Sequence, residues 1–287
     1  MNKTKATVIG KIAVVGAGTM GCGIAQALTL SGYLTTLVDV NSEALDAATE
    51  RIVSGIRTLI SRNQITEIEG QSAISRITSR SDLDVGDSDI VIEAVFDKVE
   101  VKGPLFRELD LICPSDVVFA TNTSTIPITE LASYTHRPDR FIGMHFFNPV
   151  HAMNLIEVIR GFYTSEETMD VTLKLAEALG KKAVVVEDAP GFTVNRMLVP
   201  LLNQACALLH EGAATKEAID EAVRLGLRHP MGPFQLMDLI GLDVVLDVTE
   251  SIFQRTSDPT FRPHQLLRKM VQADRLGRKN GAGWYNY

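Results

Sequence analysis

The stretch Lys11–Gly32, KIAVVGAGTMGCGIAQALTLSG, decides the fold that we expect. An apolar run of the strand type, IAVVG, leads into the pattern GAGTMG, and a segment of helical character follows at once. In this setting Gly16 permits a tight turn, Gly18 lets the backbone approach a pyrophosphate, and Gly21 lets the helix pack closely on the strand. Because a helix N-terminus attracts phosphate, the turn predicts a dinucleotide site with contacts from Gly16, Gly18, Thr19, Met20 and Gly21.

Asp39 is the candidate that selects the dinucleotide. It ends the apolar run TTLVDV, eighteen residues after Gly21. A carboxylate at this place accepts hydrogen bonds from a ribose hydroxyl pair and repels a 2′-phosphate. No arginine follows closely in the sequence to neutralise such a phosphate. The pattern therefore favours NAD over NADP.

The composition is that of an ordinary folded protein. The 287 residues are 45% hydrophobic and 22% charged, and 28 basic against 35 acidic side chains give a net charge of −7. This acidic balance does not favour a nucleic acid or a membrane surface as the partner. Three widely spaced cysteines and six scattered histidines predict neither a disulfide framework nor a metal site.

We expect a cytoplasmic protein. The first strand is expected within about ten residues of the N-terminus, too early for a leader peptide. No apolar run approaches the ~20 residues that a membrane-spanning helix requires. The cysteines form no CxxC pair, which fits a reducing compartment.

Apolar, β-branched runs alternate with helical patterns between Lys11 and Glu187, which is typical of a doubly wound α/β sheet of the Rossmann type, covered on both faces. Two helix-length segments are Ser42–Arg62 and Ser165–Gly180, and Gly180 is a candidate helix-ending glycine. The expected strands are KIAVVGAG, LTTLVDV, SDIVIEAV, DVVFATN, RFIGMHFF, NLIEVI and KAVVVE.

After Glu187 the pattern becomes helical throughout. We expect no strand there, and four helical segments: Asn195–Gly212, Thr215–Gly226, Gly232–Arg255 and Arg262–Gly277. The prediction is a Rossmann domain at residues 1–188 that binds NAD, followed by an all-helical domain at 189–287 for substrate binding and dimerisation. An apolar helical domain needs a surface on which to bury its faces, which favours a homodimer.

His145 lies in an apolar strand that ends at a turn, GMHFFNP, and is open to two interpretations: a core histidine or a catalytic base. The chain has neither a GxSxG elbow nor a GxxxxGK[ST] phosphate loop. With a dinucleotide site, hydride transfer is then the economical chemistry. Oxidation of a hydroxyl group needs a base that titrates near neutrality, and histidine meets that need. Glu157, in the apolar strand LIEVI, would be costly there unless it is paired.

Segments along nearly the whole chain resemble the L-3-hydroxyacyl-CoA dehydrogenase family, most closely its short 3-hydroxybutyryl-CoA dehydrogenases. The resemblance implies an NAD-dependent enzyme that interconverts (S)-3-hydroxyacyl-CoA and 3-ketoacyl-CoA. It also implies a homodimer with the active site in the cleft between the domains. The segments are GAGTMGCGIA, IEAVFDKVEVKGPLF, TNTS, HFFNPV, EDAPGFTVNRML, HPMGPFQLMDLIGLDV and GRKNGAGWYNY.

The resemblance assigns roles to single residues. His145 corresponds to the general base or acid, and Glu157 to the carboxylate that orients it. Ser124 would contact the 3-oxygen of the substrate, and Asn195 would bind its carbonyl region. On the cofactor side the resemblance adds Asp97, Lys102, Asn122 and Asn148.

Each of these residues also has a purely structural alternative. Ser124 and Asn122 could shape a turn or cap the helix expected after Pro127. Asn195 could be a plain helix residue, and Lys102 a solvated surface charge.

Four positions depart from the family pattern. Asp97 stands where the family usually has a glutamate, and Thr125 replaces the second serine of TNTSS. His151 and Asn154 replace the usual proline and a frequent lysine, which bears on chain-length preference and on the contacts to CoA. For the anionic nucleotide of CoA, the candidate basic residues follow Asp39: Arg51, Arg57 and Arg62.

A related β-hydroxyacid dehydrogenase that acts on a free acid, such as the gulonate or 6-phosphogluconate types, is the alternative. The latter type uses a lysine near the start of the helix that joins the domains, whereas PGFTVNRMLVPLLNQ contains Asn195 and no lysine. A free acid would also favour an arginine beside the histidine, where this chain has Phe146 and Phe147.

Overall fold

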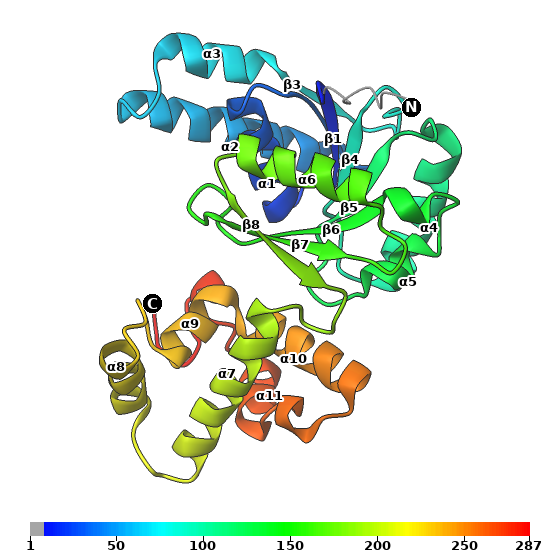
Figure 1. Ribbon diagram of the computed structural model, residues 1–287. Coiled ribbons are helices and arrows are strands. Elements are labelled where there is room, and N and C mark those ends of the chain that lie inside the picture. The colour runs from blue at the N-terminus through cyan, green and yellow to red at the C-terminus, as the bar shows by residue number, and fades with distance from the viewer. Residues whose placement is uncertain (1–8) are drawn as a thin grey trace. The chain divides into compact units, whose positions relative to one another are not determined.

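The computed structural model describes residues 9–287, and the chain divides between Ala189 and Pro190 into two compact units (Figure 1). Each unit has its own apolar core. In the described part of the chain, no helix combines the length and the apolar character that crossing a membrane requires.

The first unit is built on one eight-stranded sheet in the order β3-β2-β1-β4-β5-β6-β7-β8. The six strands β1 to β6 all run parallel to one another. The strand β7 is antiparallel to β6 and parallel to β8. The carboxyl ends of β1, β4, β5 and β6 therefore share one edge, the usual place for a ligand in such sheets. The bounds are β1 (Lys11–Val15), β2 (Leu34–Val38), β3 (Ile77–Arg80), β4 (Ile90–Glu93), β5 (Val118–Thr121), β6 (Phe141–Phe146), β7 (Leu155–Arg160) and β8 (Lys182–Glu187).

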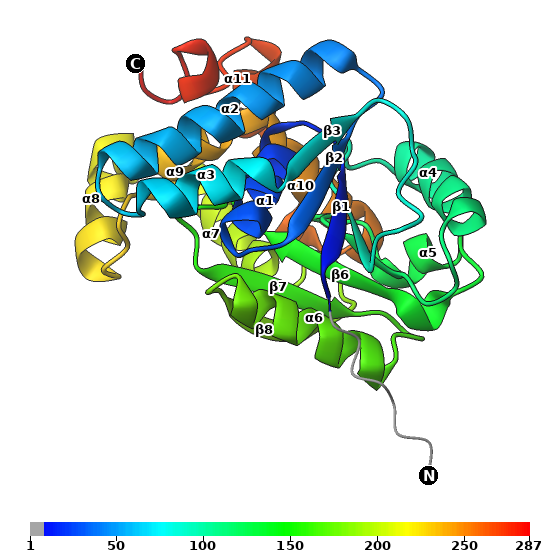
Figure 2. The ribbon, with the colours of Figure 1, turned by 90° about the horizontal axis from the view of Figure 1, so that it is seen from above.

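Helices cover both faces of this sheet. Figure 2 shows α1 and α2 on one side of the strands and α4 and α5 on the other. The helix α6 joins the α1 side, because its apolar residues belong to the same buried cluster as those of α1 and α2. The bounds are α1 (Thr19–Leu30), α2 (Ser42–Ser61), α3 (Glu67–Ser75), α4 (Val99–Ile112), α5 (Ile128–Ala132), the 3₁₀ turn η1 (Pro138–Arg140) and α6 (Glu166–Ala178).

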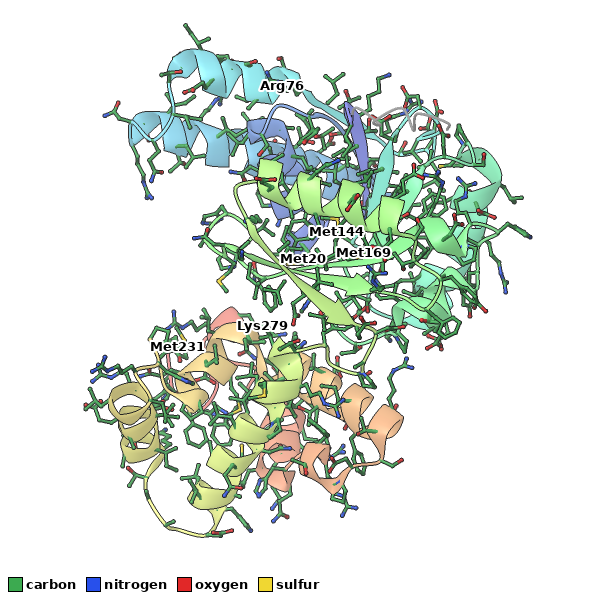
Figure 3. The ribbon with its side chains drawn as sticks, in the orientation of Figure 1. Met20, Arg76, Met144, Met169, Met231 and Lys279 are labelled. Carbon is green, nitrogen blue, oxygen red and sulfur yellow. The ribbon has the colours of Figure 1, made fainter. Side chains whose placement is uncertain are left out.

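Close packing on both faces fixes the strands that carry the site. Met20, Met144 and Met169, from α1, β6 and α6, belong to one apolar cluster (Figure 3). On the opposite face, the Phe106 ring of α4 packs edge-on against Phe141 of β6, with 4.6 Å between centroids. A side chain of this size stabilises the fold by about 1.5–3 kcal/mol when it is fully buried.

The structure contains all seven predicted strands and adds an eighth, β3. Thr78 and Ser79 in β3 are exposed, so this short strand lacks the apolar run that reveals the others. At the other end of the sheet, β8 is not covered on both faces, although the sequence predicts such cover for every strand. Val184 and Val185 are 39% and 49% exposed, because β8 is an edge strand. Gly180 follows α6 with φ +66°, as its predicted role at the helix end requires.

The second unit is helical. In its described residues, β-pairing is limited to isolated bridges near the C-terminus. The segment expected as one helix over Gly232–Arg255 is two helices, because Gly241 has φ +104°, which no α-helix can include. The bounds are α7 (Val194–His210), α8 (Lys216–Gly226), α9 (Pro233–Ile240), α10 (Leu242–Thr256), η2 (Pro259–Phe261), α11 (Gln265–Gln272) and η3 (Arg278–Asn280).

A buried carboxylate holds the C-terminal tail onto this helical unit. Asp238 in α9 is fully buried and accepts hydrogen bonds from the backbone N–H of Trp284 and Tyr285 and from the hydroxyl of Tyr287. The Trp284 ring packs against Phe234 at 4.7 Å between centroids. A doubly wound sheet followed by a helical C-terminal region confirms the predicted fold class.

Candidate active site

The glycine turn between β1 and α1 has the shape that a dinucleotide needs. Gly16 has φ +110°, and a Cβ atom there would lie 2.6 Å from the carbonyl oxygen of Ala94. A Cβ atom on Gly21 would lie 1.7 Å from the carbonyl oxygen of Gly16, so α1 approaches the turn as closely as backbone allows. A Cβ atom on Gly18 would meet nothing within 4 Å, which leaves that side of the turn open.

The start of α1 adds the electrostatic part of this fit. Among residues 9–287, no side chain caps the start of α1 at Gly18, and the first turn of α1 carries no acidic residue. The first backbone N–H groups, near Thr19 and Met20, therefore offer donors and a positive helix end to a phosphate. These residues fit the NAD pyrophosphate that the sequence predicts.

Asp39 is fixed at the end of β2 by the same turn. Its Oδ2 atom accepts a hydrogen bond from the backbone N–H of Ala17 (2.8 Å), and its Oδ1 atom accepts one from Asn41 (3.0 Å). Each carboxylate oxygen can accept a further hydrogen bond. The Asp39 carboxylate is thus preorganised beside the glycine turn, as a partner of ribose hydroxyl groups would be.

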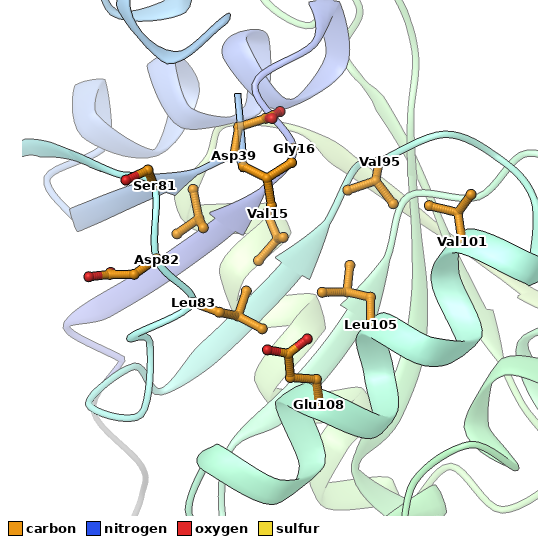
Figure 4. A pocket seen from close by; sticks show the side chains of 12 residues that line it. Val15, Gly16, Asp39, Ser81, Asp82, Leu83, Val95, Val101, Leu105 and Glu108 are labelled. Atoms are coloured by element: carbon orange, nitrogen blue, oxygen red, sulfur yellow. The ribbon is translucent and has the colours of Figure 1, made fainter. Parts of the chain in front are cut away.

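A pocket of about 420 Å³ lies beside Gly16 and Asp39 (Figure 4). Its walls are largely apolar, and its polar groups suit a nucleoside: an apolar slot for the base and carboxylates for hydroxyl or amino groups. Most of these residues carry no local sequence signal, because the fold assembles them from separate loops and from α4. The lining residues outside the glycine turn are Val15, Val38, Asp39, Val40, Ser81, Asp82, Leu83, Val95, Val101, Leu105 and Glu108.

An arginine does lie close to Asp39 in space, although none follows closely in the sequence. Arg80 ends β3, and its carbonyl oxygen accepts a hydrogen bond from the Asp39 N–H at 3.3 Å. Its guanidinium is held by Asp82 at 2.8 Å and by Asp84 at 2.9 Å. Asp82 and Asp84 thus balance the charge of an arginine whose backbone pairs with Asp39 at the predicted ribose site.

His145 and Glu157 form a buried pair across the antiparallel strands β6 and β7. The two residues are directly opposite in the strand register, and His145 Nδ1 lies 2.8 Å from Glu157 Oε2. Their side chains are 6% and 1% exposed. A buried carboxylate next to Nδ1 favours the tautomer with its proton on Nδ1 and leaves Nε2 as an acceptor.

Ser124 meets the other ring nitrogen. Its hydroxyl oxygen lies 3.3 Å from His145 Nε2, so the structure brings Ser124, His145 and Glu157 into one line. The helix-capping alternative for Ser124 and Asn122 is wrong, since the first N–H groups of α5 donate to Asp188 instead. Asn122, directly after β5, ties that strand to the end of β6, because its side-chain oxygen accepts the backbone N–H of Phe146 at 2.8 Å.

Lys102 is fully buried in α4, so the alternative of a solvated surface charge is wrong. Its ammonium lies 2.5 Å from Glu93 Oε1 and 3.6 Å from Asp97 Oδ1. Asp97 in turn accepts the backbone N–H of Ser124 at 2.9 Å. Glu93 was not among the predicted site residues, although an acidic residue at the end of the buried run IVIE is a recognisable signal.

The loop after β6 carries Asn148 and His151, and both are exposed. Lys181, just before β8, holds this loop: its ammonium donates to the carbonyl oxygens of Val150 (2.6 Å) and Met153 (2.7 Å). Burial lowers the pKa of Lys181.

Asn195 lies in the first turn of α7, in the helical unit, and is partly buried.

Comparison with known proteins identifies the family. Residues 11–189 match the family model for the NAD binding domain of 3-hydroxyacyl-CoA dehydrogenase, and residues 191–287 match the model for its C-terminal domain. The chain belongs to the 3-hydroxyacyl-CoA dehydrogenase family. Of the predicted site residues, all except Asn195 lie within the NAD binding domain of this family.

Relatives within the 3-hydroxyacyl-CoA dehydrogenase family match the chain over almost its whole length. A probable 3-hydroxybutyryl-CoA dehydrogenase of Bacillus subtilis is 47% identical, over 97% of this chain and 98% of its own. The 3-hydroxybutyryl-CoA dehydrogenase of Clostridioides difficile is 42% identical, over 96% of this chain and 99% of its own. The crystal structure of (S)-3-hydroxybutyryl-CoA dehydrogenase from Ralstonia eutropha superposes with a TM-score of 0.94 at 44% identity, covering 98% of this chain and 99% of that one.

Proposed function

We propose that the protein is an NAD-dependent dehydrogenase that interconverts (S)-3-hydroxyacyl-CoA and 3-ketoacyl-CoA, with 3-hydroxybutyryl-CoA and acetoacetyl-CoA as the first pair to test. The observation that carries this proposal is the line from Glu157 through His145 to Ser124. Family membership and relatives named 3-hydroxybutyryl-CoA dehydrogenase support the choice of substrate class.

His145 is the proposed general base in oxidation and the general acid in reduction. Its Nε2 atom takes the proton of the substrate 3-hydroxyl group as hydride leaves the same carbon, and returns it in the reverse direction. Glu157 holds Nδ1–H and stabilises the imidazolium that forms. When bound, NAD supplies the acceptor of the hydride.

Ser124 and Asn195 are the proposed substrate contacts. The Ser124 hydroxyl, already beside His145 Nε2, would hold the 3-oxygen of the substrate within reach of the base. The Asn195 amide would donate to the carbonyl region of the acyl group, where a donor stabilises developing negative charge. Both roles follow the family resemblance.

The proposed cofactor site combines the glycine turn, Asp39 and the pocket beside it. The open side of Gly18 and the uncapped start of α1 would receive the pyrophosphate, with Thr19 and Met20 as backbone donors. Asp39 would accept the adenosine ribose hydroxyl groups. Further proposed contacts come from the loops after β4, β5 and β6 and from α4: Asp97, Lys102, Asn122 and Asn148.

We also propose a cytoplasmic homodimer that associates through its helical domain. Large apolar side chains are exposed on that unit: Met197 is 75%, Leu225 61% and Leu227 58% exposed. Light scattering at micromolar concentration checks the assembly, and a mass near the 31.4 kDa of one chain would contradict it.

The activity is tested by following NADH absorbance with acetoacetyl-CoA as substrate. We expect NADH to be consumed and, in the reverse assay, only the (S) isomer of 3-hydroxybutyryl-CoA to be oxidised. A series of longer 3-ketoacyl-CoA substrates would define the chain-length range. Turnover of a free 3-hydroxy acid without turnover of acetoacetyl-CoA would contradict the CoA assignment and favour the free-acid alternative.

A further inference from the structure

Glu93 is a fully buried carboxylate at the carboxyl end of β4, next to the predicted active site. Its Oε1 atom accepts hydrogen bonds from the Lys102 ammonium (2.5 Å) and from the Val95 N–H (2.7 Å), and its Oε2 atom accepts one from the Thr121 hydroxyl (2.6 Å). Burial raises the pKa of Glu93, and these three donors act against that shift. The carboxylate therefore ties β4 to the end of β5 and to α4.

Lys102 lies between two carboxylates and connects Glu93 to Asp97. Its ammonium is 2.5 Å from Glu93 and 3.6 Å from Asp97, and its side chain has no exposed surface. The side chain of Asp97 is 34% exposed, so it marks the place where this buried network reaches solvent. A buried charge pair contributes little net stability compared with apolar side chains of similar size, so stability alone gives weak grounds for placing one here.

The network ends at the proposed base. Asp97 Oδ2 accepts the backbone N–H of Ser124, and the Ser124 hydroxyl lies 3.3 Å from His145 Nε2. Thr121, which donates to Glu93, is three residues before Ser124 on the same strand and loop. Glu93 thus fixes the Ser124 loop twice, once through Thr121 and once through Lys102 and Asp97.

We propose that Glu93 is a positioning residue of the reaction, which acts through Lys102 to hold the Ser124 hydroxyl in line with His145. The proposal rests on the proposed function, because it assigns Ser124 and His145 to the chemistry. Removing the Glu93 charge releases the Lys102 ammonium from its partner, and Asp97 then no longer holds the Ser124 N–H at its present place. A displacement of this kind is small, but proton transfer depends steeply on distance and orientation.

A double-mutant cycle separates this role from a direct role of Lys102 at the cofactor. The four proteins are the wild type, Glu93→Gln, Lys102→Met and the double variant, and kcat and KM are measured for acetoacetyl-CoA and NADH. We expect Glu93→Gln to lower kcat about 10-fold or more, with a smaller change in KM, in the wild-type background. In the Lys102→Met background the same change should lower kcat about 3-fold or less, because only the contact between Glu93 and Thr121 then remains to be lost. Equal losses of kcat in both backgrounds, or a wild-type kcat for Glu93→Gln, would overturn the proposal.

Thr121→Val is the second variant, in case Glu93→Gln leaves the buried ammonium with Asp97 as its remaining carboxylate partner and does not fold. It removes one of the three donors of the carboxylate and leaves both charges in place. We expect kcat to fall about 3-fold while KM holds, and wild-type kcat for this variant would also overturn the proposal. Lys98→Met removes an exposed charge four residues before Lys102 and should leave kcat unchanged.

Hydrogen exchange gives a readout that does not depend on the substrate. In the wild type the Ser124 N–H is held by Asp97, so its exchange should be slow. In Glu93→Gln or Thr121→Val this amide should exchange faster, whereas amides in α6 should not change. If acetoacetyl-CoA is not reduced by the wild type, the proposed function fails, and unchanged Ser124 exchange would separately overturn the positioning role.

Discussion

His145 on β6 and Glu157 on β7 face each other directly across two antiparallel strands, with 2.8 Å between Nδ1 and Oε2. Directly opposed residues have Cβ atoms about 4.5–5.5 Å apart, close enough for these two side chains to meet without strain. The sheet therefore sets the geometry of the pair, and the buried surroundings make an unpaired Glu157 costly.

Replacing His145 by glutamine should remove the proton transfer and leave cofactor binding intact. We expect kcat with acetoacetyl-CoA to fall about 10²–10⁴-fold, the usual contribution of a positioned acid or base. NADH affinity, measured by fluorescence titration, should stay close to that of the wild type. His136→Gln is the matched control, because the His136 side chain is 95% exposed. Loss of NADH affinity together with kcat would mean that His145 serves the cofactor site instead.

The glycine turn predicts two different outcomes for two similar changes. Gly21→Ala places a methyl group 1.7 Å from the Gly16 carbonyl oxygen, so α1 must shift. Overpacking of this kind destabilises by about 1–3 kcal/mol or more, and thermal unfolding should show it. Gly18→Ala meets no atom within 4 Å, so the fold should keep its Tm. NADH affinity should nevertheless fall about 10-fold, because the methyl group occupies the side that a pyrophosphate would approach.

Gly226→Ala is the control for the NADH measurement, since a Cβ atom there also meets no atom of the described residues within 4 Å and its φ is ordinary. It should leave NADH affinity unchanged. If Gly18→Ala bound NADH as well as the wild type does, the phosphate would have to lie elsewhere.

The sequence predicts the glycine turn and the buried strands of the first unit, because the signals for these features are local. The glycine turn, Asp39 and the run of buried strands each lie within a short segment, and their physical meaning does not depend on distant contacts. The polar strand β3 was missed because Thr78 and Ser79 are exposed and show no apolar run. The helical periodicity of Gly232–Arg255 predicts one helix through Gly241, because a positive φ leaves no trace in such a pattern.

The candidate site depends more on long-range contacts. The residues of the His145 pair were predicted by resemblance, whereas their facing geometry follows from the antiparallel register of β6 and β7, which periodicity does not determine. Lys102 was predicted as a cofactor contact, but its burial and its pairing with Glu93 depend on how α4 packs on the sheet. Leu83 and Leu105 line the same pocket only because the fold brings a loop and a helix together.

Cofactor selectivity should depend on Asp39 and Arg80 together. Asp39→Ser removes the carboxylate that would repel a 2′-phosphate. The backbone of Arg80 pairs with Asp39, and its guanidinium could turn from Asp82 and Asp84 to such a phosphate. We expect the NADH-to-NADPH ratio of kcat/KM to fall about 10–100-fold, equivalent to about 1.4–2.8 kcal/mol. Asp39→Ser combined with Arg80→Ala should lose most of the gain for NADPH. Asp46→Ser on the exposed side of α2 is the control. An unchanged ratio in Asp39→Ser would place cofactor selectivity in other residues.

His264 should make the stability of the helical unit depend on pH. Its Nδ1 atom accepts the backbone N–H of Leu266 and so caps α11, a role that requires an unprotonated nitrogen. Burial lowers the pKa of His264, the nearby His210 lowers it further, and Glu211 opposes the shift. With the folded pKa below the unfolded value of about 6.5, the unfolded chain binds the proton first. Stability should therefore be complete above about pH 6.5 and decline as the pH falls through that value.

Thermal unfolding at pH 7.5 and pH 5.5 measures this effect. His264→Asn keeps a side-chain oxygen that can cap the helix but cannot titrate in this range. We expect the wild type to lose about 2–4 °C more than His264→Asn on going to the lower pH. His151→Asn, at an exposed position, should behave as the wild type does. If His264→Asn shows the full pH dependence of the wild type, the titrating group must be another residue, and the cap at α11 would not be the point at which acid weakens the unit.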